Sequence, residues 1–203
     1  MDAEAEIARL RTADRLKEAA TLAIESYGPE VLSFLQVMVR DHADAADAFA
    51  QACEDLWKGL PRFEGRSLMK TWFYTLARHA ALRLRRSSRA DRVASLSEIT
   101  EVAERVRTQT RPHLKTEIKV GFAAIRATLG DEDRMLLALR VDRGMSWNDV
   151  ARVMADEGDD GSDEEVARVA ARLRKRFQSV KESIRERAIA TGLISATDPD
   201  DPP

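Results

Sequence analysis

Apolar residues recur every three or four positions through most of the chain, and this spacing predicts α-helices. The first helix is expected over residues 12–27. Gly28 and Pro29 are then expected to end it and open a second helix, because proline suits the first helical turn. The second helix carries these apolar residues at helical spacing: Val31, Leu32, Leu35 and Met38.

Two further helices complete the first half. Asp44 can cap a third helix, with Asp47 at the capping-box position, and Gly59 and Pro61 end it. Its apolar stripe consists of Ala45, Phe49, Ala52, Cys53, Leu56 and Leu60. A fourth helix is predicted over residues 67–86, where Trp72 and Phe73 are expected to pack into the core. These four helices are enough for one small bundle.

The second half predicts another helical unit after a polar stretch. Residues 87–112 lack core-forming residues, apart from a short helical pattern over residues 96–106. Helices are predicted over residues 114–129 and 131–142. A short helix is capped by Ser146 with Asp149, and a long one to about residue 190 is capped by Ser162 with Glu165. Two capped helices in succession form a helix-turn-helix pattern.

The fold class is therefore all-α, with two small helical domains joined by a flexible linker. The predicted boundaries are residues 10–90 for the first domain, 91–113 for the linker and 114–192 for the second domain. Residues 193–203 are expected to form a disordered tail.

Composition excludes several classes of protein. No apolar run approaches the roughly 20 residues of a membrane helix, and the N-terminus has no signal-peptide core. The lone Cys53 excludes an internal disulfide, is expected to be buried and inert, and fits a reducing cytoplasm. No catalytic constellation, glycine-rich phosphate loop or metal-ligand cluster is present, since His42, His79 and His113 are dispersed. The chain is therefore expected to be no enzyme and to need no cofactor or metal.

Charge is distributed unevenly along the chain. A net charge of −2 argues against a free-standing DNA-binding protein. Residues 62–92, however, hold nine basic residues against two acidic ones, while residues 1–60 hold twelve acidic against six basic. This asymmetry indicates one surface for nucleic acid and another for a protein. Cations interleaved with Phe63, Trp72, Phe73 and Tyr74 suit a nucleic-acid strand, because rings can stack on unpaired bases.

Motifs in both halves resemble one known family. The first half contains Tyr27-Gly28-Pro29-Glu30-Val31-Leu32, Asp44-x-x-Asp47, Trp57-x-x-Leu60-Pro61-Arg62-Phe63 and Gly65-Arg66-Ser67-x-x-x-Thr71-Trp72-x-Tyr74-x-x-Ala77-Arg78. The second half contains Gly144-Met145-Ser146-Trp147-x-x-Val150-Ala151, followed by Val169-x-x-Arg172-Leu173. The first set resembles region 2 of bacterial extracytoplasmic-function sigma factors, and the second resembles their region 4. The resemblance covers about residues 16–190.

The resemblance implies a dissociable, cytoplasmic subunit of bacterial RNA polymerase that has no active site. In that family, region 2 binds the polymerase clamp, melts the −10 promoter element and holds the non-template strand. Region 4 binds the polymerase flap and recognises the −35 element as duplex, and the linker runs towards the active-site channel. The implied partners are core polymerase, duplex and single-stranded promoter DNA, and an anti-sigma factor, without membrane insertion.

The resemblance also assigns residues to three contacts. Those for −10 DNA are Arg62, Phe63, Arg66, Ser67, Lys70, Thr71, Tyr74, Arg78, His79 and Arg85. Those for −35 DNA are Arg168, Arg172, Lys175 and Arg176, and those for the polymerase are Asp44, Asp47, Gln51 and Glu54. The interpretation requires the Tyr74 and Arg78 surface to be exposed. The basic stripe of the fourth helix consists of Lys70, Tyr74, Arg78 and Arg85, and the acidic face of the third helix consists of Asp47, Gln51 and Glu54. For both, the alternative is an ordinary solvated helix surface.

Three departures from the family pattern bear on function. Ala50, followed by Gln51, stands where the family commonly has Gln, and His79 stands where it often has Asn. The turn at residues 156–165, the acidic turn, holds seven acidic residues and no basic one. Part of this complements the dipole of the following helix, and EF-hand spacing for calcium is absent. The hypothesis is that the acidic turn projects from the DNA-binding face and weakens autonomous binding.

Two other functions remain open at this point. A helix-turn-helix repressor or activator would bind duplex DNA alone, and a pure interaction protein, such as an anti-sigma antagonist, would use the acidic helix. The region 2 pattern disfavours the first, and the basic stripe disfavours the second.

Overall fold

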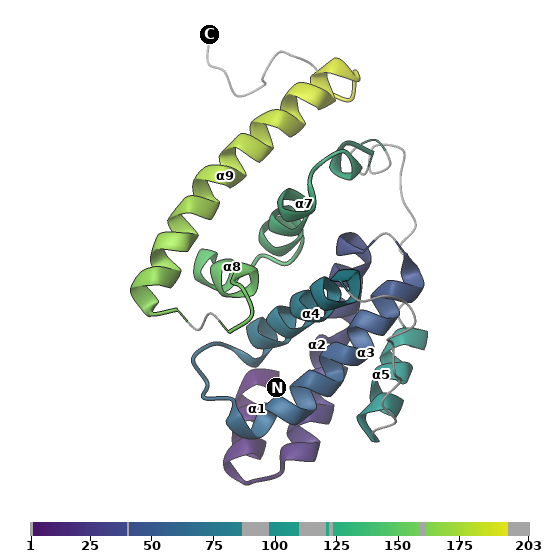
Figure 1. Cartoon of the computed structure of the whole chain (residues 1–203), viewed down its shortest axis with the longest axis vertical. Helices are drawn as coiled ribbons and strands as arrows, with labels where there is room; N and C mark the ends of the chain where they lie inside the picture. Colours follow the sequence, from purple (N-terminus) through teal and green to yellow (C-terminus); the bar gives the residue numbers. More distant parts are fainter. Residues whose placement is uncertain are drawn as a thin grey trace.

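The computed structural model describes residues 2–39, 41–86, 98–109, 121, 124–158 and 161–194. Every regular element within these residues is helical, which confirms the all-α class (Figure 1). The first half consists of α1 (Ala3–Thr12), α2 (Leu16–Met38), α3 (His42–Gly59), the 3-10 turn η1 (Leu60–Arg62), α4 (Met69–Arg86) and α5 (Glu98–Gln109). The second half consists of α7 (Asp131–Leu137), a π-helical turn η3 (Ala138–Asp142), α8 (Trp147–Met154) and α9 (Asp163–Ala190).

The helix break expected at Gly28 and Pro29 is wrong, because α2 continues through both residues. Gly28 is buried where helices approach closely: a Cβ atom there would lie 3.1 Å from the Phe49 ring and 3.1 Å from Val106. Pro29 removes one backbone donor, but apolar residues on both sides of it face the same core. Packing along the whole length of α2 therefore outweighs the local signal.

The starts of α3 and α4 also differ from expectation. Asp41 caps α3 by accepting hydrogen bonds from the backbone N–H of Ala43 at 2.7 Å and of Asp44 at 3.1 Å, so Asp44 is not the cap. α4 begins at Met69, and its first N–H groups donate to the carboxylate of Glu4 in α1. This cap is supplied from about 65 residues away, so no local pattern could reveal it.

The described part of the predicted linker is a helix that belongs to the first bundle. α5 packs against α2 and α3 and buries Val102, Ala103 and Val106. The short helical pattern expected over residues 96–106 is thus confirmed, and in this part the linker is a packed helix where flexibility was expected. Residues 91–97 and 110–113 of the predicted linker lie outside the described residues, and the domain boundaries stay predictions.

Of the two capping boxes predicted for the second half, the one at Ser162 is confirmed in full, and at Ser146 the N-cap is confirmed without the reciprocal backbone bond. Ser146 accepts a hydrogen bond from the backbone N–H of Asp149 at 3.2 Å, and α8 follows. Ser162 and Glu165 exchange side-chain-to-backbone hydrogen bonds at the start of α9. Most of the helix predicted over residues 114–129, and the tail from residue 195, lie outside the described residues.

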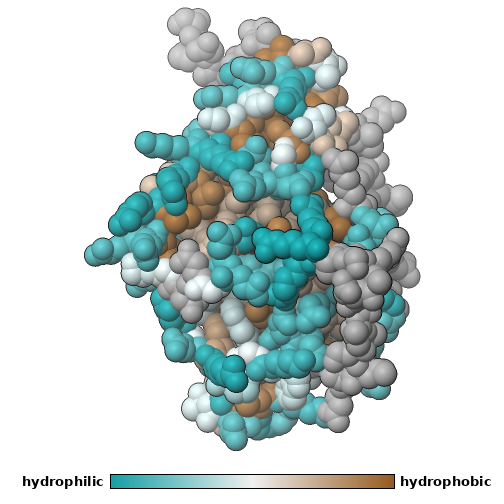
Figure 2. Space-filling view, viewed as in Figure 1, coloured by the Kyte–Doolittle hydropathy of each residue, from teal (hydrophilic) through white to brown (hydrophobic). Residues whose placement is uncertain are grey.

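The two halves are in contact, with α8 lying on α4 (Figure 1). Buried apolar residues of both halves form one continuous cluster. α4 is therefore covered by α2 and α3 on one side and by α8 on another, while α9 continues away from the bundle. On the face of the molecule drawn in Figure 2, hydrophilic side chains cover most of the surface, and apolar surface lies in separate patches. The docking of the halves thus decides which residues of α4 reach solvent.

Candidate nucleic-acid interface

The turn at residues 63–67, the capture turn, is built around two stacked rings. Phe63 stacks on Trp72 of α4, with ring centroids 4.7 Å apart and ring planes inclined by 22°. Gly65 has a φ of +77°, in the left-handed region that favours glycine. Arg62 and Arg66 are exposed on either side of it. The turn combines exposed cations with a packed pair of rings, and its cations and ring edges are suited to contact an unpaired base.

Helix α1 holds the capture turn in place. The Arg11 guanidinium lies over the Phe63 ring at 4.6 Å and donates a hydrogen bond to the Phe63 carbonyl oxygen. Glu4 caps the helix that follows the turn. Both ends of the turn are therefore fixed by one helix that the sequence patterns did not single out.

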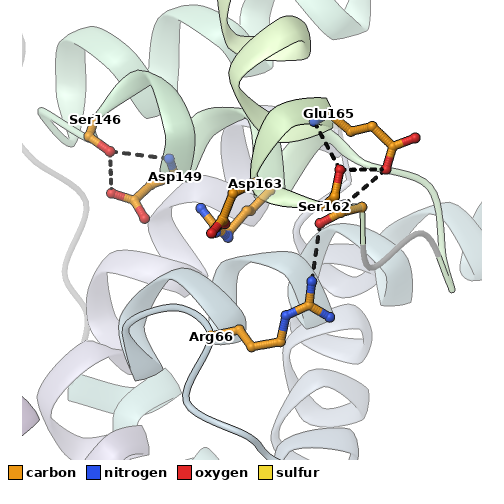
Figure 3. A network of polar contacts seen from close by, with 8 residues as sticks. Arg66, Ser146, Asp149, Ser162, Asp163 and Glu165 are labelled. Carbon is orange, nitrogen blue, oxygen red and sulfur yellow. Dashed lines mark hydrogen bonds and ion pairs between the residues drawn. The ribbon is translucent and has the colours of Figure 1, made fainter.

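A cavity of about 390 Å³ separates the capture turn from the second half. Phe63, Arg66 and Trp72 line one side, and residues of α8 and of the acidic turn line the other. Figure 3 shows Arg66 extending from the turn towards the start of α9, where it donates to the Gly161 carbonyl at 3.1 Å.

Tyr74 is a core residue, which contradicts its expected place on an exposed basic stripe. It is fully buried, and its ring meets the edge of Phe34 in α2 at a centroid distance of 5.2 Å. Its hydroxyl lies 3.4 Å from a Glu30 carboxylate oxygen. Burial raises the pKa of Tyr74. Lys70 forms an ion pair with Glu30 at 2.7 Å. The cause is the crossing of α2 over α4, which encloses this face within the first bundle.

Arg78 and His79 are buried for a different reason, since α8 of the second half lies over them. They are 7% and 8% exposed, and Nη1 of Arg78 donates to the Ala155 carbonyl at 2.6 Å. The Nε2 atom of His79 lies 3.1 Å from the same oxygen. Thr71, also buried, donates to a carboxylate oxygen of Asp149 at 3.0 Å. Their expected exposure is therefore wrong for this arrangement of the halves.

The described residues of the acidic turn, 156–158 and 161–165, lie near the first half, so this part of the turn does not project freely from the DNA-binding face. Glu157 forms an ion pair with Arg83, which also pairs with Asp55. Burial lowers the pKa of the Arg78 guanidinium, and the nearby charge of Asp156 opposes this shift. Arg85 pairs with Asp131 at the start of α7. Basic side chains of α4 are therefore neutralised by acidic groups from the second half.

The basic residues of α9 divide into two groups. Arg168, Arg172 and Lys175 are exposed along its N-terminal half. Arg176 instead pairs with Glu132 and, at 2.6 Å, with Asp133, and these hydrogen bonds raise the pKa of its guanidinium. Arg176 is thus turned towards α7, away from the open face.

Comparisons with known proteins match the first half to one family. The family model for Sigma-70 region 2 matches residues 23–90. The RNA polymerase sigma-H factor of Pseudomonas aeruginosa is 28% identical over 146 residues, covering 68% of this chain and 76% of the relative. The ECF RNA polymerase sigma factor SigX of Bacillus subtilis is 26% identical over 145 residues, covering 68% and 74%. No solved structure matches the chain. Residues 23–90 therefore form a Sigma-70 region 2 domain, and the chain is similar to extracytoplasmic-function sigma factors.

The region 2 domain carries the acidic face on α3. Asp47 and Gln51 are exposed, Asp44 is half-buried, and Gln51 donates to Asp55 at 2.8 Å. Glu54 is buried and pairs with Lys58 at 2.8 Å. The structure therefore brings three of the four predicted polymerase-binding residues to the surface and turns Glu54 inward.

The remaining features bear on redox chemistry, metal binding and membrane insertion. Cys53 is buried, as expected, and burial raises the pKa of its thiol. Among the described residues, no group of His, Cys, Asp and Glu could hold a metal ion. None of the described helices has both the length and the apolar character required to span a bilayer.

Proposed function

We propose that this sigma factor directs core RNA polymerase to promoters by capturing the unpaired −10 strand and reading the −35 duplex. The observation that carries the proposal is the capture turn, in which Phe63 and Trp72 are stacked beside exposed Arg62 and Arg66. The protein performs no catalysis of its own and acts in the cytoplasm with the polymerase.

The capture turn provides the melting activity. A base that leaves the duplex gains contacts with the turn and with Ser67, which the paired base cannot make. Lys70 adds a phosphate contact beside it, and Arg85, at the far end of α4, adds one after its ion pair with Asp131 has opened. Trapping the open strand shifts the equilibrium towards melted DNA. Tyr74 supports the turn from the core, and Thr71, Arg78 and His79 contact DNA only after α8 has left α4.

The N-terminal half of α9 provides the duplex contact. Arg168, Arg172 and Lys175 lie three or four residues apart, so they share one helix face that a major groove accepts. Arginine can pair with both acceptors of a guanine edge, which discriminates by about 1–3 kcal/mol. Arg176 supports this helix through its ion pairs with α7 and adds at most a phosphate contact.

The acidic face of α3, with Asp44, Asp47 and Gln51, is the proposed contact with the polymerase clamp, and region 4 contacts the flap. Charges at the rim of such an interface tune association rate and partner choice. An anti-sigma factor is the expected regulator.

Run-off transcription with purified core polymerase tests this function. The full chain should support initiation from duplex promoters selected from genomic fragments. The Phe63→Ala variant should lose initiation on duplex templates and regain most of it on templates melted beforehand at the −10 element. Initiation that is independent of the chain, or symmetric DNA half-sites protected without polymerase, would instead favour a stand-alone helix-turn-helix regulator.

A further inference from the structure

We infer that the α4 face of region 2 is a shared docking surface, bound either by promoter DNA or by the helix-turn-helix unit of the same chain. The acidic turn supplies carboxylates where DNA would supply phosphates. This inference rests on the proposed function, because it concerns the same −10 site. Promoter DNA and the helix-turn-helix unit therefore exclude each other on the α4 face.

The residues that α8 covers are ones that the family pattern assigns to −10 DNA. Thr71, Arg78 and His79, all assigned to −10 DNA by the family pattern, are buried under α8 and the residue that follows it. The Ala155 carbonyl occupies the space that a DNA backbone oxygen would need, since Arg78 and His79 both point at it. A strand cannot reach these side chains while α8 is docked.

The acidic turn that follows α8 carries negative charge, as DNA phosphates do. Guanidinium groups bind carboxylates and phosphates with the same geometry. Glu157 takes Arg83, and Asp156 lies near enough to Arg78 to affect its pKa. Arg66 of the capture turn donates to the backbone of the acidic turn at Gly161, beside the capping box drawn in Figure 3. At Asp156, Glu157 and Gly161 the acidic turn therefore contacts the same cations that a nucleic-acid strand would contact.

The contact between α4 and the α8 side of the second half is weak enough to separate. Within the described residues, the buried Nε of Arg78 has no hydrogen-bond partner, and a buried guanidinium held mainly by one carbonyl stays poorly compensated. The Arg83–Glu157 pair is exposed and therefore screened by salt. An interface of this kind is weak enough for polymerase, which binds both regions, to pull it apart.

Charge removal in the acidic turn gives the first test. The double variant Asp156→Asn, Glu157→Gln should bind the labelled non-template strand of a promoter used by the wild type about fivefold more tightly at low salt, by loss of weak ion pairs. The control is Glu182→Gln, Glu186→Gln, which changes net charge equally on the exposed far half of α9. Equal tightening in both variants would show a general charge effect and overturn the inference.

A reversible lock gives the second test. Thr71→Cys and Asp149→Cys join α4 to α8 at a side-chain contact of 3.0 Å in the wild type. The oxidised form should lose binding of the strand and run-off transcription at least tenfold relative to the same variant after reduction. Equal binding in the two forms would overturn the inference. If the wild type itself does not initiate with core polymerase, the proposed function fails instead, so the two failures are distinguishable.

Discussion

The basic surfaces of α4 and α9 carry the same kind of side chain in opposite states. On α9, Arg168, Arg172 and Lys175 stand open to solvent, whereas on α4 Arg78 is enclosed and Arg83 is paired with acidic groups. Under the proposed function, the −35 contact is therefore available in the isolated chain, whereas the −10 contacts of α4 require the two halves to separate.

α4 itself contains two kinds of buried residue. The Tyr74 ring packs against α2, within the bundle that α4 belongs to, so separation of the halves should leave the ring buried and remove only the interaction of its hydroxyl with Arg143. Arg78 and His79 are covered by α8, so the same separation exposes them. The predictions below test this distinction.

The largest expected effect is at Tyr74. The Tyr74→Ala variant should lower the free energy of unfolding by about 3–5 kcal/mol, as for other large aromatic truncations in cores. Tyr74→Phe keeps the ring and should cost less than about 1.5 kcal/mol. Urea denaturation measures both. A folded Tyr74→Phe variant that no longer binds the −10 strand would show that the hydroxyl contacts DNA, contrary to its place in the core.

The open face of α9 should give the next largest effect. Arg168→Ala or Arg172→Ala should weaken binding of the polymerase complex to −35 duplex by about 1–3 kcal/mol where the side chain contacts a base. The midpoint of urea unfolding should stay unchanged. Arg176→Ala is the matched control, because its ion pairs with α7 predict loss of stability with a smaller effect on DNA. Anisotropy titration at fixed salt measures the binding, and an equal loss for Arg176→Ala would contradict this division.

A smaller effect is expected at the cap that α1 provides. Glu4→Ala should cost about 0.5–2 kcal/mol of stability, the usual range for a lost helix cap, and should accelerate hydrogen exchange at Met69 and Lys70. Glu4→Gln should retain part of the protection, because its amide oxygen still accepts one hydrogen bond. Glu6→Ala, which removes only an ion pair with Arg9 on the same helix, is the control. Unchanged exchange in Glu4→Ala would exclude the cap.

The smallest effect concerns the ion pairs between the halves. Arg83→Gln should change stability by less than about 1 kcal/mol, because its pairs are largely exposed. It should nevertheless raise the radius of gyration measured by small-angle X-ray scattering, as should added salt. Arg9→Gln, whose partner Glu6 lies within α1, should leave the radius unchanged. The same change in both variants would remove the role assigned to Arg83.

Local patterns were sufficient for the helical class, the N-cap at Ser146, the capping box at Ser162, the buried Cys53 and the motifs of region 2. Each of these depends on residues within about one or two helical turns of one another, so the order of residues along the chain contains the information. The same patterns were misleading at Gly28 and Pro29, where the close approach of α3 and α5 keeps α2 continuous.

Whether the proposed DNA-binding residues are exposed, buried or ion-paired is decided by the tertiary structure. Periodicity assigns Tyr74 and Arg78 to a face of α4, but whether that face meets water depends on α2 and α8, which come from distant parts of the chain. Other contacts also join residues that are far apart in the sequence. They are the cap that Glu4 provides for α4, the packing of Arg11 on Phe63 and the ion pairs of Arg176 with α7. Burial and pairing are properties of what surrounds a side chain, and in this chain the surroundings are supplied by other helices.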